Sequence, residues 1–253
     1  MARDELISRR ASSFGSRAAD YAEHRPDYPV DAVRWALAPI STATPTVLDL
    51  AAGTGKLTAV IASLGLDVIA VEPDDAMRAK LAALMPEVTA VSGTAEQIPL
   101  ADASVDAVLV GQALHWFDHE KALPEIGRVL RPGGVLAGLW NDDDLTIEWV
   151  RNLDRIHSST DNRQNKRGID LPTQLGPFGE LAHREFRHAQ RRTAESLVAT
   201  ASTHSLFLTM AEPERSRTLD AMLAYLKSQP ETADGEFDYP LRTEVLRTVR
   251  TTP

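Results

Sequence analysis

Residues 47–57 read VLDLAAGTGKL, an apolar run that ends in a loop of small residues with glycines at positions 53 and 55. The run has the length and composition of a buried strand. Residues 56–65 read KLTAVIASLG, the pattern of a helix that ends at a glycine. A loop of small residues between a strand and a helix lets the backbone approach a ligand closely. The stretch therefore predicts a binding loop, and its flanking residues must decide the ligand.

The same alternation continues to residue 140 and predicts the fold. Strand patterns lie at 46–51, 67–72, 87–93, 104–111 and 135–140, helix patterns lie at 56–65, 74–85 and 119–130, and RPGG at 131–134 is expected to be a turn. Strands rich in Val, Leu and Ala that alternate with helices indicate a sheet covered on both faces. We expect an α/β protein with a doubly wound, mostly parallel sheet of the Rossmann-like kind.

We interpret the chain as a single domain, residues 1–253, in four parts. Residues 1–45 are expected to form helices that cover a cofactor, 46–141 the cofactor-binding core, 142–192 a helix and an irregular, variable helical insertion after the fifth strand, and 193–253 C-terminal helices and a closing strand. FDYPLRTEVLRTV (237–249) alternates well enough to be that strand, and it could run antiparallel.

Composition narrows the classes of function. Of 253 residues 43% are hydrophobic, which supports a sizeable core. The formal net charge is −9 without a run of like charges, so a nucleic-acid partner is not expected. The chain has no cysteine, which excludes disulfides and a cysteine nucleophile. MARDELISRR (1–10) lacks the apolar segment of a signal peptide, and no apolar stretch could span a bilayer. We expect a cytoplasmic protein that acts on a small molecule without a membrane partner; its oligomeric state stays open.

Two common ligands fit the glycine loop poorly. A P-loop needs a glycine where Leu50 stands and a hydroxyl where Leu57 stands. The dinucleotide fingerprint needs a third glycine where Thr58 stands, and none of the four tyrosines is followed by a lysine four residues later. Glu72, at the end of the second strand, is placed to accept hydrogen bonds from a ribose diol. The missing glycine and the missing tyrosine–lysine pair make a dinucleotide-dependent oxidoreductase a less favoured alternative.

Further segments complete a family pattern. DLAAGTGKL (49–57) resembles the first motif of class I S-adenosylmethionine-dependent methyltransferases, and VEPDDAM (71–77) resembles the second. GTAEQIPLADASVDAV (93–108) resembles the third, and RVLRPGG (128–134) resembles the turn before the fifth strand. The resemblance spans residues 47–140. It implies S-adenosyl-L-methionine as the cofactor and S-adenosyl-L-homocysteine as the product.

The resemblance also implies roles for individual residues. Glu72 would bind the ribose, Met77 would lie on the adenine face, and a polar group near Ala95 and Glu96 would meet the adenine amine. The cofactor-binding residues implied in this part of the chain are Asp49, Ala51, Gly53, Thr54, Gly55, Glu72, Pro73, Met77, Thr94, Ala95, Glu96 and Gln112.

Two segments resemble a narrower subgroup. VLVGQALHWFD (108–118) and FGSRAADYAEHRPDYP (14–29) are similar to segments of trans-aconitate methyltransferases and related methyltransferases of type 11. That resemblance implies that Tyr21 and Arg25 cover the cofactor, and the Arg25 guanidinium would pair with the methionyl carboxylate. A core tyrosine and a solvated arginine are the alternative interpretation.

The methyl acceptor is expected to be an oxygen atom of a small molecule, with a carboxylate as one option. His115, just past the fourth strand, is the candidate general base, since its ordinary pKa suits proton transfer near neutrality. A structural histidine is the alternative. Trp116, Phe117 and Trp140 are the expected walls of the substrate pocket. Residues 151–193, with a local balance of +4, could contribute arginines to a carboxylate site, although such charges are usually solvated.

A metal site is not expected. HWFDH (115–119) imitates a zinc spacing, but Asp118 stands where that motif has a glutamate, and a helix cap falls inside it. NDDD (141–144) follows the fifth strand as in some Mg²⁺-dependent enzymes, yet Gly111 and Gln112 stand where those carry an aspartate. A sensor or scaffold that binds the cofactor without turnover remains a further alternative.

Overall fold

The computed structural model describes residues 27–157, 176–202, Phe207 and 210–251. The elements in chain order are α3 (Val30–Leu37), β1 (Thr46–Leu50), α4 (Lys56–Ser63), β2 (Asp67–Val71), α5 (Asp75–Leu84), β3 (Thr89–Val91), β4 (Val105–Gly111), the 3₁₀ turn η1 (Leu114–Trp116), α6 (His119–Val129), β5 (Leu130–Asp143), α7 (Glu148–His157), β6 (Ala182–Arg192), α9 (Ala194–Ser202), α11 (Glu212–Ser228) and β7 (Phe237–Val249).

These strands form one sheet in the order β3-β2-β1-β4-β5-β7-β6. Strands β1 to β5 run parallel to one another, whereas β7 is antiparallel to both β5 and β6. The mostly parallel α/β sheet is confirmed, and so is the antiparallel closing strand.

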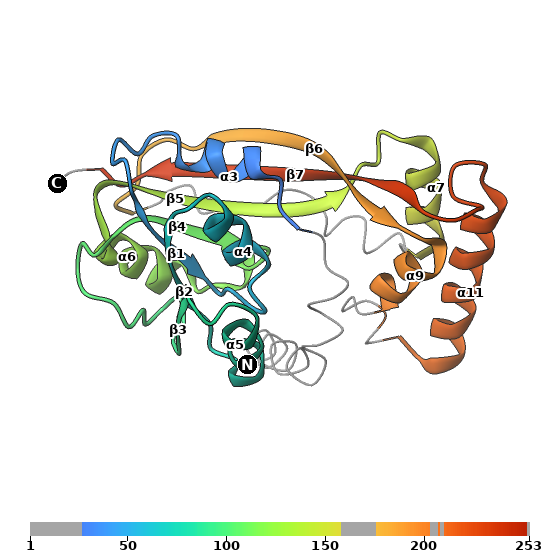
Figure 1. Cartoon of the computed structure of the whole chain (residues 1–253), viewed down its shortest axis with the longest axis horizontal. Helices are drawn as coiled ribbons and strands as arrows, with labels where there is room; N and C mark the ends of the chain where they lie inside the picture. The colour runs from blue at the N-terminus through green and yellow to red at the C-terminus, as the bar shows by residue number, and fades with distance from the viewer. Residues whose placement is uncertain (1–26, 158–175, 203–206, 208–209, 252–253) are drawn as a thin grey trace.

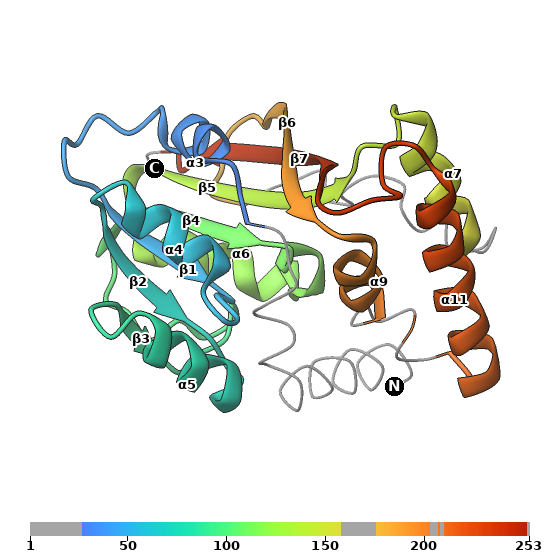
Figure 2. The same cartoon turned by 45° about the vertical axis from the view of Figure 1, so that its right-hand side comes forward.

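Alternate residues of the parallel strands fill two separate cores. On β4, Ala107 and Leu109 join the core under α3, α4 and α5, while Val108 and Val110 join the core under α6. All four side chains are fully buried, as expected for a strand with helices on both sides. Figures 1 and 2 show the helices on the two faces of the sheet.

Residues 131–134 do not form a separate turn before the fifth strand. Leu130 already pairs with Val105, and Val135 pairs with Ala107, so four residues of β5 bulge opposite Asp106. Gly133 has φ +77°, which a residue without a side chain adopts at little cost. Arg131 closes the bulge with a 2.7 Å ion pair to Asp106. Residues 131–134 were expected to be a turn before a strand that begins at residue 135, but β5 already begins at Leu130.

The expectation of an irregular helical insertion at 142–192 is wrong for its last part. Helix α7 is present, but residues 182–192 form β6, an eleven-residue edge strand paired with β7. Most of its side chains are exposed or half-buried, so its sequence, AHREFRHAQRR, lacks the apolar alternation of a core strand. Charged side chains are common on edge strands because they discourage pairing with other chains.

A third core lies beyond the parallel sheet. Strands β5 and β7 extend past β4 and carry α7, α9 and α11, as Figure 1 shows. Phe237, Tyr239 and Leu241 on β7 pack against Val150 of α7 and Leu226 of α11 in this core. We call this part, α7, α9, α11 and the adjoining end of β7, the helical lobe.

Helix α3 covers the sheet rather than a cofactor site. Ala32, Val33 and Ala36 are fully buried in the first core. Trp35 lies 4.0 Å from the guanidinium of Arg247 on β7, a cation–π contact. Residues 1–45 were expected to cover the cofactor. Helix α3, which lies in the described part of this range, packs on the sheet instead. None of the helices in the described ranges combines the length and apolar character that a bilayer crossing requires.

Candidate functional site

Two pockets meet at the carboxyl edge of the parallel strands, on either side of the loop after β1. The β1 pocket has a volume of about 60 Å³ and lies between this loop, Tyr28 and Asn141. The larger β2 pocket, about 430 Å³ and open to solvent, lies between the loop, the end of β2 and the segment 93–96. Ala51, Gly53, Gly111 and Gln112 line both pockets. The carboxyl edge is where open parallel sheets bind ligands.

The loop after β1 curls through left-handed backbone conformations. Ala51, Gly53 and Gly55 have φ of 60°, 58° and 91°. The curl turns the N–H of Gly53 toward β2, where it donates to Glu72 Oε2 at 2.8 Å. The N–H of Ala52 donates to the carbonyl of Val71 at 3.1 Å. The loop is thus fastened to the end of β2 at two points, which gives the junction of the pockets a fixed shape.

Glu72 is a nearly buried carboxylate at that junction. Its Oε1 accepts the N–H of Asp74 at 2.9 Å, and its Oε2 accepts that of Gly53. Burial raises the pKa of Glu72, while these two N–H bonds oppose the rise. Each oxygen keeps a lone pair for one more donor, because a carboxylate oxygen accepts two hydrogen bonds. Glu72 therefore suits a ligand that presents two hydroxyl groups.

Asp49 is fully buried under the β1 pocket. Its Oδ2 accepts the Thr58 hydroxyl at 2.5 Å, but its Oδ1 has no hydrogen-bond partner. Burial raises the pKa of Asp49 to about 7, the Thr58 bond opposes the rise, and the charge of Glu72 adds to it. A buried acceptor without a donor is costly, so Asp49 suits a ligand that brings an N–H or a positive charge.

The β2 pocket is walled by the segments that were expected to meet an adenine. The predicted residues that line it are Ala51, Gly53, Glu72, Pro73, Met77, Thr94, Ala95, Glu96, Gln112, Trp116 and Phe117. Asp74 caps α5 through bonds to the N–H groups of Ala76 and Met77, which fixes Met77 beside the loop. Glu96 accepts the N–H of Asp118 at 3.1 Å, which ties this wall to the start of α6.

The geometry can be compared with known proteins. A family model described as "Methyltransferase domain" matches residues 48–138. An uncharacterized methyltransferase of Mycobacterium tuberculosis is 41% identical over 223 residues, 88% of this chain and 89% of that protein. The chain belongs to the methyltransferases. Its fold and cofactor are those of the class I, S-adenosylmethionine-dependent group.

Two further comparisons agree with this assignment. An uncharacterized methyltransferase-like protein of Schizosaccharomyces pombe is 35% identical over 217 residues, 81% of this chain and 82% of that protein. The solved structure of a putative type II methyltransferase from Anaeromyxobacter dehalogenans covers 90% of this chain and 99% of that chain, with a TM-score of 0.67 and 25% identity. The narrower resemblance to trans-aconitate methyltransferases stays a prediction.

In this methyltransferase, Gly55 serves packing rather than the pocket. It does not belong to the lining of either pocket, unlike Asp49, Ala51, Gly53, Thr54 and Gln112, which line the β1 pocket. A Cβ at Gly55 would overlap Met85 Cε and lie 3.0 Å from Leu81 Cγ. Glycine at this position lets α4 and α5 approach each other closely. This packing explains why the loop has a glycine here.

His115 and Trp140 lie outside both pockets of the methyltransferase. Trp140 is 7% exposed and packs in the core across Gly138 and Leu114, instead of forming the expected pocket wall. Its Nε1 donates to Nδ1 of His115 at 3.4 Å. Burial, and secondarily the charge of His119, lower the pKa of His115. A neutral imidazole whose Nδ1 accepts carries its proton on Nε2, so neither nitrogen is poised to accept another. The role of His115 as a base stays a prediction.

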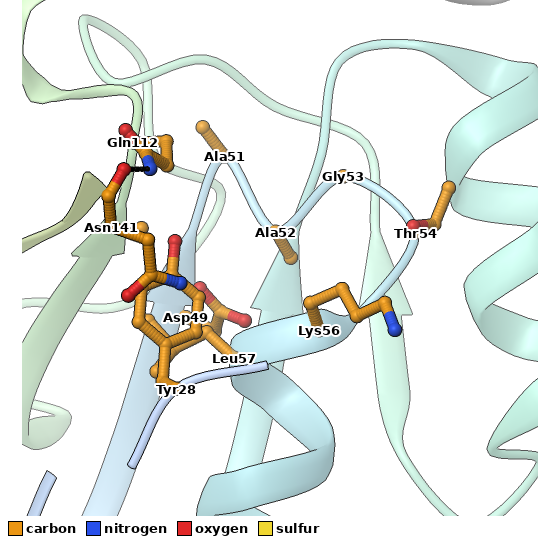
Figure 3. Close-up of a pocket in the computed structure, with 11 residues that line it drawn as sticks. Tyr28, Asp49, Ala51, Ala52, Gly53, Thr54, Lys56, Leu57, Gln112 and Asn141 are labelled. Atoms are coloured by element: carbon orange, nitrogen blue, oxygen red, sulfur yellow. Dashed lines mark hydrogen bonds between the residues drawn. The ribbon is translucent and has the colours of Figure 1, made fainter. Parts of the chain in front are cut away.

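Several residues of the β1 pocket were missed as site residues from the sequence, three of them with polar side chains. Tyr28, Lys56 and Asn141 line it beside Asp49, and Figure 3 shows Tyr28 and Asn141 gathered with Asp49 on one side of the loop. Lys56 also makes a 2.9 Å ion pair with Asp27. Only the tertiary fold brings these residues together, although Asn141 opens the NDDD segment that had drawn attention.

Some predicted residues cannot be placed. Tyr21 and Arg25 lie outside the described residues, as do Arg163 and Arg167 of the basic insertion. Arg151 and Arg155 lie on α7, where they donate to the carbonyl of Leu145 and to Oδ1 of Asn152. Within the described ranges, three or more His, Asp or Glu side chains never gather as a metal site would require.

Proposed function

We propose that this methyltransferase moves the methyl group of S-adenosylmethionine to an oxygen atom of a small molecule. A net charge of −9 supports a small acceptor over a nucleic acid. The observation that carries the proposal is the pair of pockets that meet at Ala51, Gly53 and Gln112. Such an arrangement suits a cofactor in which a methionyl part and an adenosyl part are joined at the reactive sulfonium.

The residues present fit that cofactor. Asp49 Oδ1 is a buried acceptor without a donor, which suits the ammonium group of a methionyl moiety in the β1 pocket. Glu72 has a free lone pair on each oxygen for the ribose hydroxyls, and Met77, Ala95 and Phe117 offer apolar walls to the adenine in the β2 pocket.

The sulfonium supplies an activated methyl group, so the protein need not generate one. The remaining work is to align an acceptor lone pair with the carbon–sulfur bond and to keep competing water away. Ala51, Gly53 and Gln112 would lie beside the reacting centre, because they border both pockets. A hydroxyl acceptor loses its proton as the new bond forms, whereas a carboxylate has none to lose.

A metabolite-library screen for release of S-adenosylhomocysteine tests the proposal. We expect release that depends on one or a few library members and that falls when Glu72 is replaced by alanine. Calorimetry with S-adenosylhomocysteine on the same preparations separates binding from turnover. Tight binding without release from any acceptor would favour the sensor interpretation, and preferential binding of NAD(P)H would favour an oxidoreductase.

A further inference from the structure

Gln112 occupies an unusual place in the fold. It follows the last residue of β4, lines both pockets, and has a left-handed backbone with φ +58°. Its N–H donates to the carbonyl of Leu139 at 2.8 Å, which holds the backbone in that conformation. Glycine adopts this conformation without the steric cost that a side chain brings. A glutamine at this point therefore suggests that its amide is needed, because strained residues gather at functional sites.

A hydrogen-bonded row fixes the orientation of that amide. Gln112 Nε2 donates to the carbonyl of Asn141 at 2.8 Å, the bond dashed in Figure 3. The opposite orientation would place two oxygen atoms against each other, so chemistry excludes it. Gln112 lines both pockets, and this bond leaves its Oε1, a hydrogen-bond acceptor, available to a ligand.

Asn141 is itself held in place from β7 and from the segment before α3. Its Oδ1 accepts the Thr243 hydroxyl at 2.5 Å, and its Nδ2 donates to the carbonyl of Asp27 at 3.3 Å. Because the Thr243 hydroxyl has only one proton, His188 Nε2 must donate to Thr243 Oγ1 across their 2.9 Å contact. Every donor in this row points toward Asn141 or past it to Asp27. These bonds hold the Asn141 side chain, and the pairing of Asn141 with Thr243 in the sheet fixes the backbone carbonyl to which Gln112 donates.

The charges around the pockets point in the same direction. The described lining of the β2 pocket has three carboxylates, Glu72, Asp74 and Glu96, and no lysine or arginine. In the described lining of the β1 pocket the cation is Lys56, and Asp27 already pairs with it at 2.9 Å. The positive sulfonium of the cofactor would offset part of this negative charge, so the discrimination against a carboxylate falls to Gln112 Oε1, which accepts from a hydroxyl and has no proton to offer a carboxylate.

From these observations we infer that Gln112 Oε1 binds the hydroxyl proton of a neutral acceptor and thereby selects a hydroxyl group over a carboxylate. The inference rests on the proposed function and deepens it. The acceptor hydroxyl donates to Oε1, which turns an oxygen lone pair toward the methyl carbon. That lone pair forms the new carbon–oxygen bond, the carbon–sulfur electrons remain on sulfur, and the hydroxyl proton passes to solvent water. The products are a methyl ether and S-adenosylhomocysteine.

The chemical class of the product tests this selection. The enzyme is incubated with S-adenosylmethionine labelled in its methyl group and with the small-molecule fraction of a bacterial lysate. Mild base releases the label of a methyl ester as volatile methanol but leaves that of a methyl ether in place. We expect base-stable label that hot hydroiodic acid releases as methyl iodide, as it does from a methyl ether. Base-labile label would overturn the inference and leave the proposed transfer to oxygen intact, whereas absence of any label would overturn the proposed function itself. Base-stable label that hydroiodic acid does not release would lie on nitrogen or carbon and would overturn the inference together with the transfer to oxygen.

The variant Gln112→Gly tests the proposed role of the Gln112 amide in binding the acceptor. It removes the amide and relieves the backbone strain, so we expect an equal or higher melting temperature. For the acceptor found above, kcat/KM should fall at least about tenfold, the value of a lost hydrogen bond to a polar group, and this loss should exceed any loss of affinity for S-adenosylhomocysteine. Ala103→Gly is the matched control, because Ala103 has φ 49° and belongs to neither pocket lining. A loss of cofactor affinity as large as the loss in kcat/KM, or unchanged kcat/KM, would overturn the inference.

Discussion

The buried carboxylate of Asp49 predicts a pH-dependent stability that a single substitution should remove. Burial raises the pKa of Asp49 in the folded protein from its ordinary value of 3.8 to about 7. A carboxyl group with a raised folded pKa destabilises the folded state. Its cost is absent below pH 3.8 and complete above about pH 7. The difference corresponds to about 4 kcal/mol in full, and to about 2 kcal/mol between about pH 5.5 and about pH 8.

Asp49→Asn tests this cost. The amide keeps an acceptor for the Thr58 hydroxyl and is neutral at every pH of interest. Urea unfolding of both proteins without cofactor, at about pH 5.5 and about pH 8, gives the free energies of unfolding. We expect the original protein to lose about 2 kcal/mol relative to Asp49→Asn as the pH rises across this interval. Titrating groups that do not interact with Asp49 are common to both proteins and cancel, whereas the repulsion between Asp49 and Glu72 is part of the measured cost.

Asp67→Asn is the matched control, because it makes the same chemical change at an exposed position of the neighbouring strand β2. Its stability difference from the original protein should stay within about 0.5 kcal/mol at both pH values. If Asp49→Asn and the original protein change in parallel with pH, the attribution of the cost to Asp49 is refuted. S-adenosylhomocysteine should reduce the cost, because an ammonium group beside Oδ1 favours the ionised carboxylate.

Three further substitutions follow from the site. Glu72→Ala should weaken cofactor binding by about 1–3 kcal/mol in calorimetry, since the two backbone N–H groups and the ribose lose a charged acceptor; unchanged affinity would remove Glu72 from the site. Gly55→Ala should lower the free energy of unfolding more than Gly65→Ala does. Both glycines have positive φ but only Gly55 would bring its Cβ against α5, so equal losses of about 1–2 kcal/mol would contradict the packing argument. His115→Asn should reduce kcat by less than about tenfold, because Nδ1 already accepts from Trp140; a loss of 100-fold or more with a changed pH profile would restore the general base.

The parallel half of the fold could be predicted because its signals are local. Each strand there is a short run of Val, Leu, Ile or Ala, and helix boundaries carry their own marks, such as Asp74 at the start of α5 and Gly65 after α4. Strand β6 could not, because its partner β7 lies about 50 residues later and its exposed side chains need no apolar pattern. Register, rather than propensity, also decides that β5 begins at Leu130.

The residues of the site also divide into those that the sequence predicts and those that only the fold brings together. Asp49, Gly53, Glu72 and the residues of 93–96 belong to contiguous motifs, and the structure brings them to one edge. Tyr28 and Asn141 reach the β1 pocket from segments that no motif includes. For Trp140, the sequence could not tell a pocket wall from a core residue. That choice depends on Gly138 two positions earlier on the same face of β5, where the indole covers the space a side chain would take.

The position of β7 in the sheet determines which parts of the chain can fold before synthesis is complete. β7 inserts between β5 and β6, two strands that precede it in the chain, and β6 has no other neighbour in the described sheet. During synthesis the cofactor core, β1 to β4, can assemble as soon as its residues leave the ribosome. Strand β6 and helices α7, α9 and α11 must wait for residues 237–249 before they can pack on β7. A nascent chain stopped before residue 237 would therefore hold the parts that bind the cofactor, without the row from β7 that fixes Asn141 and, through it, Gln112.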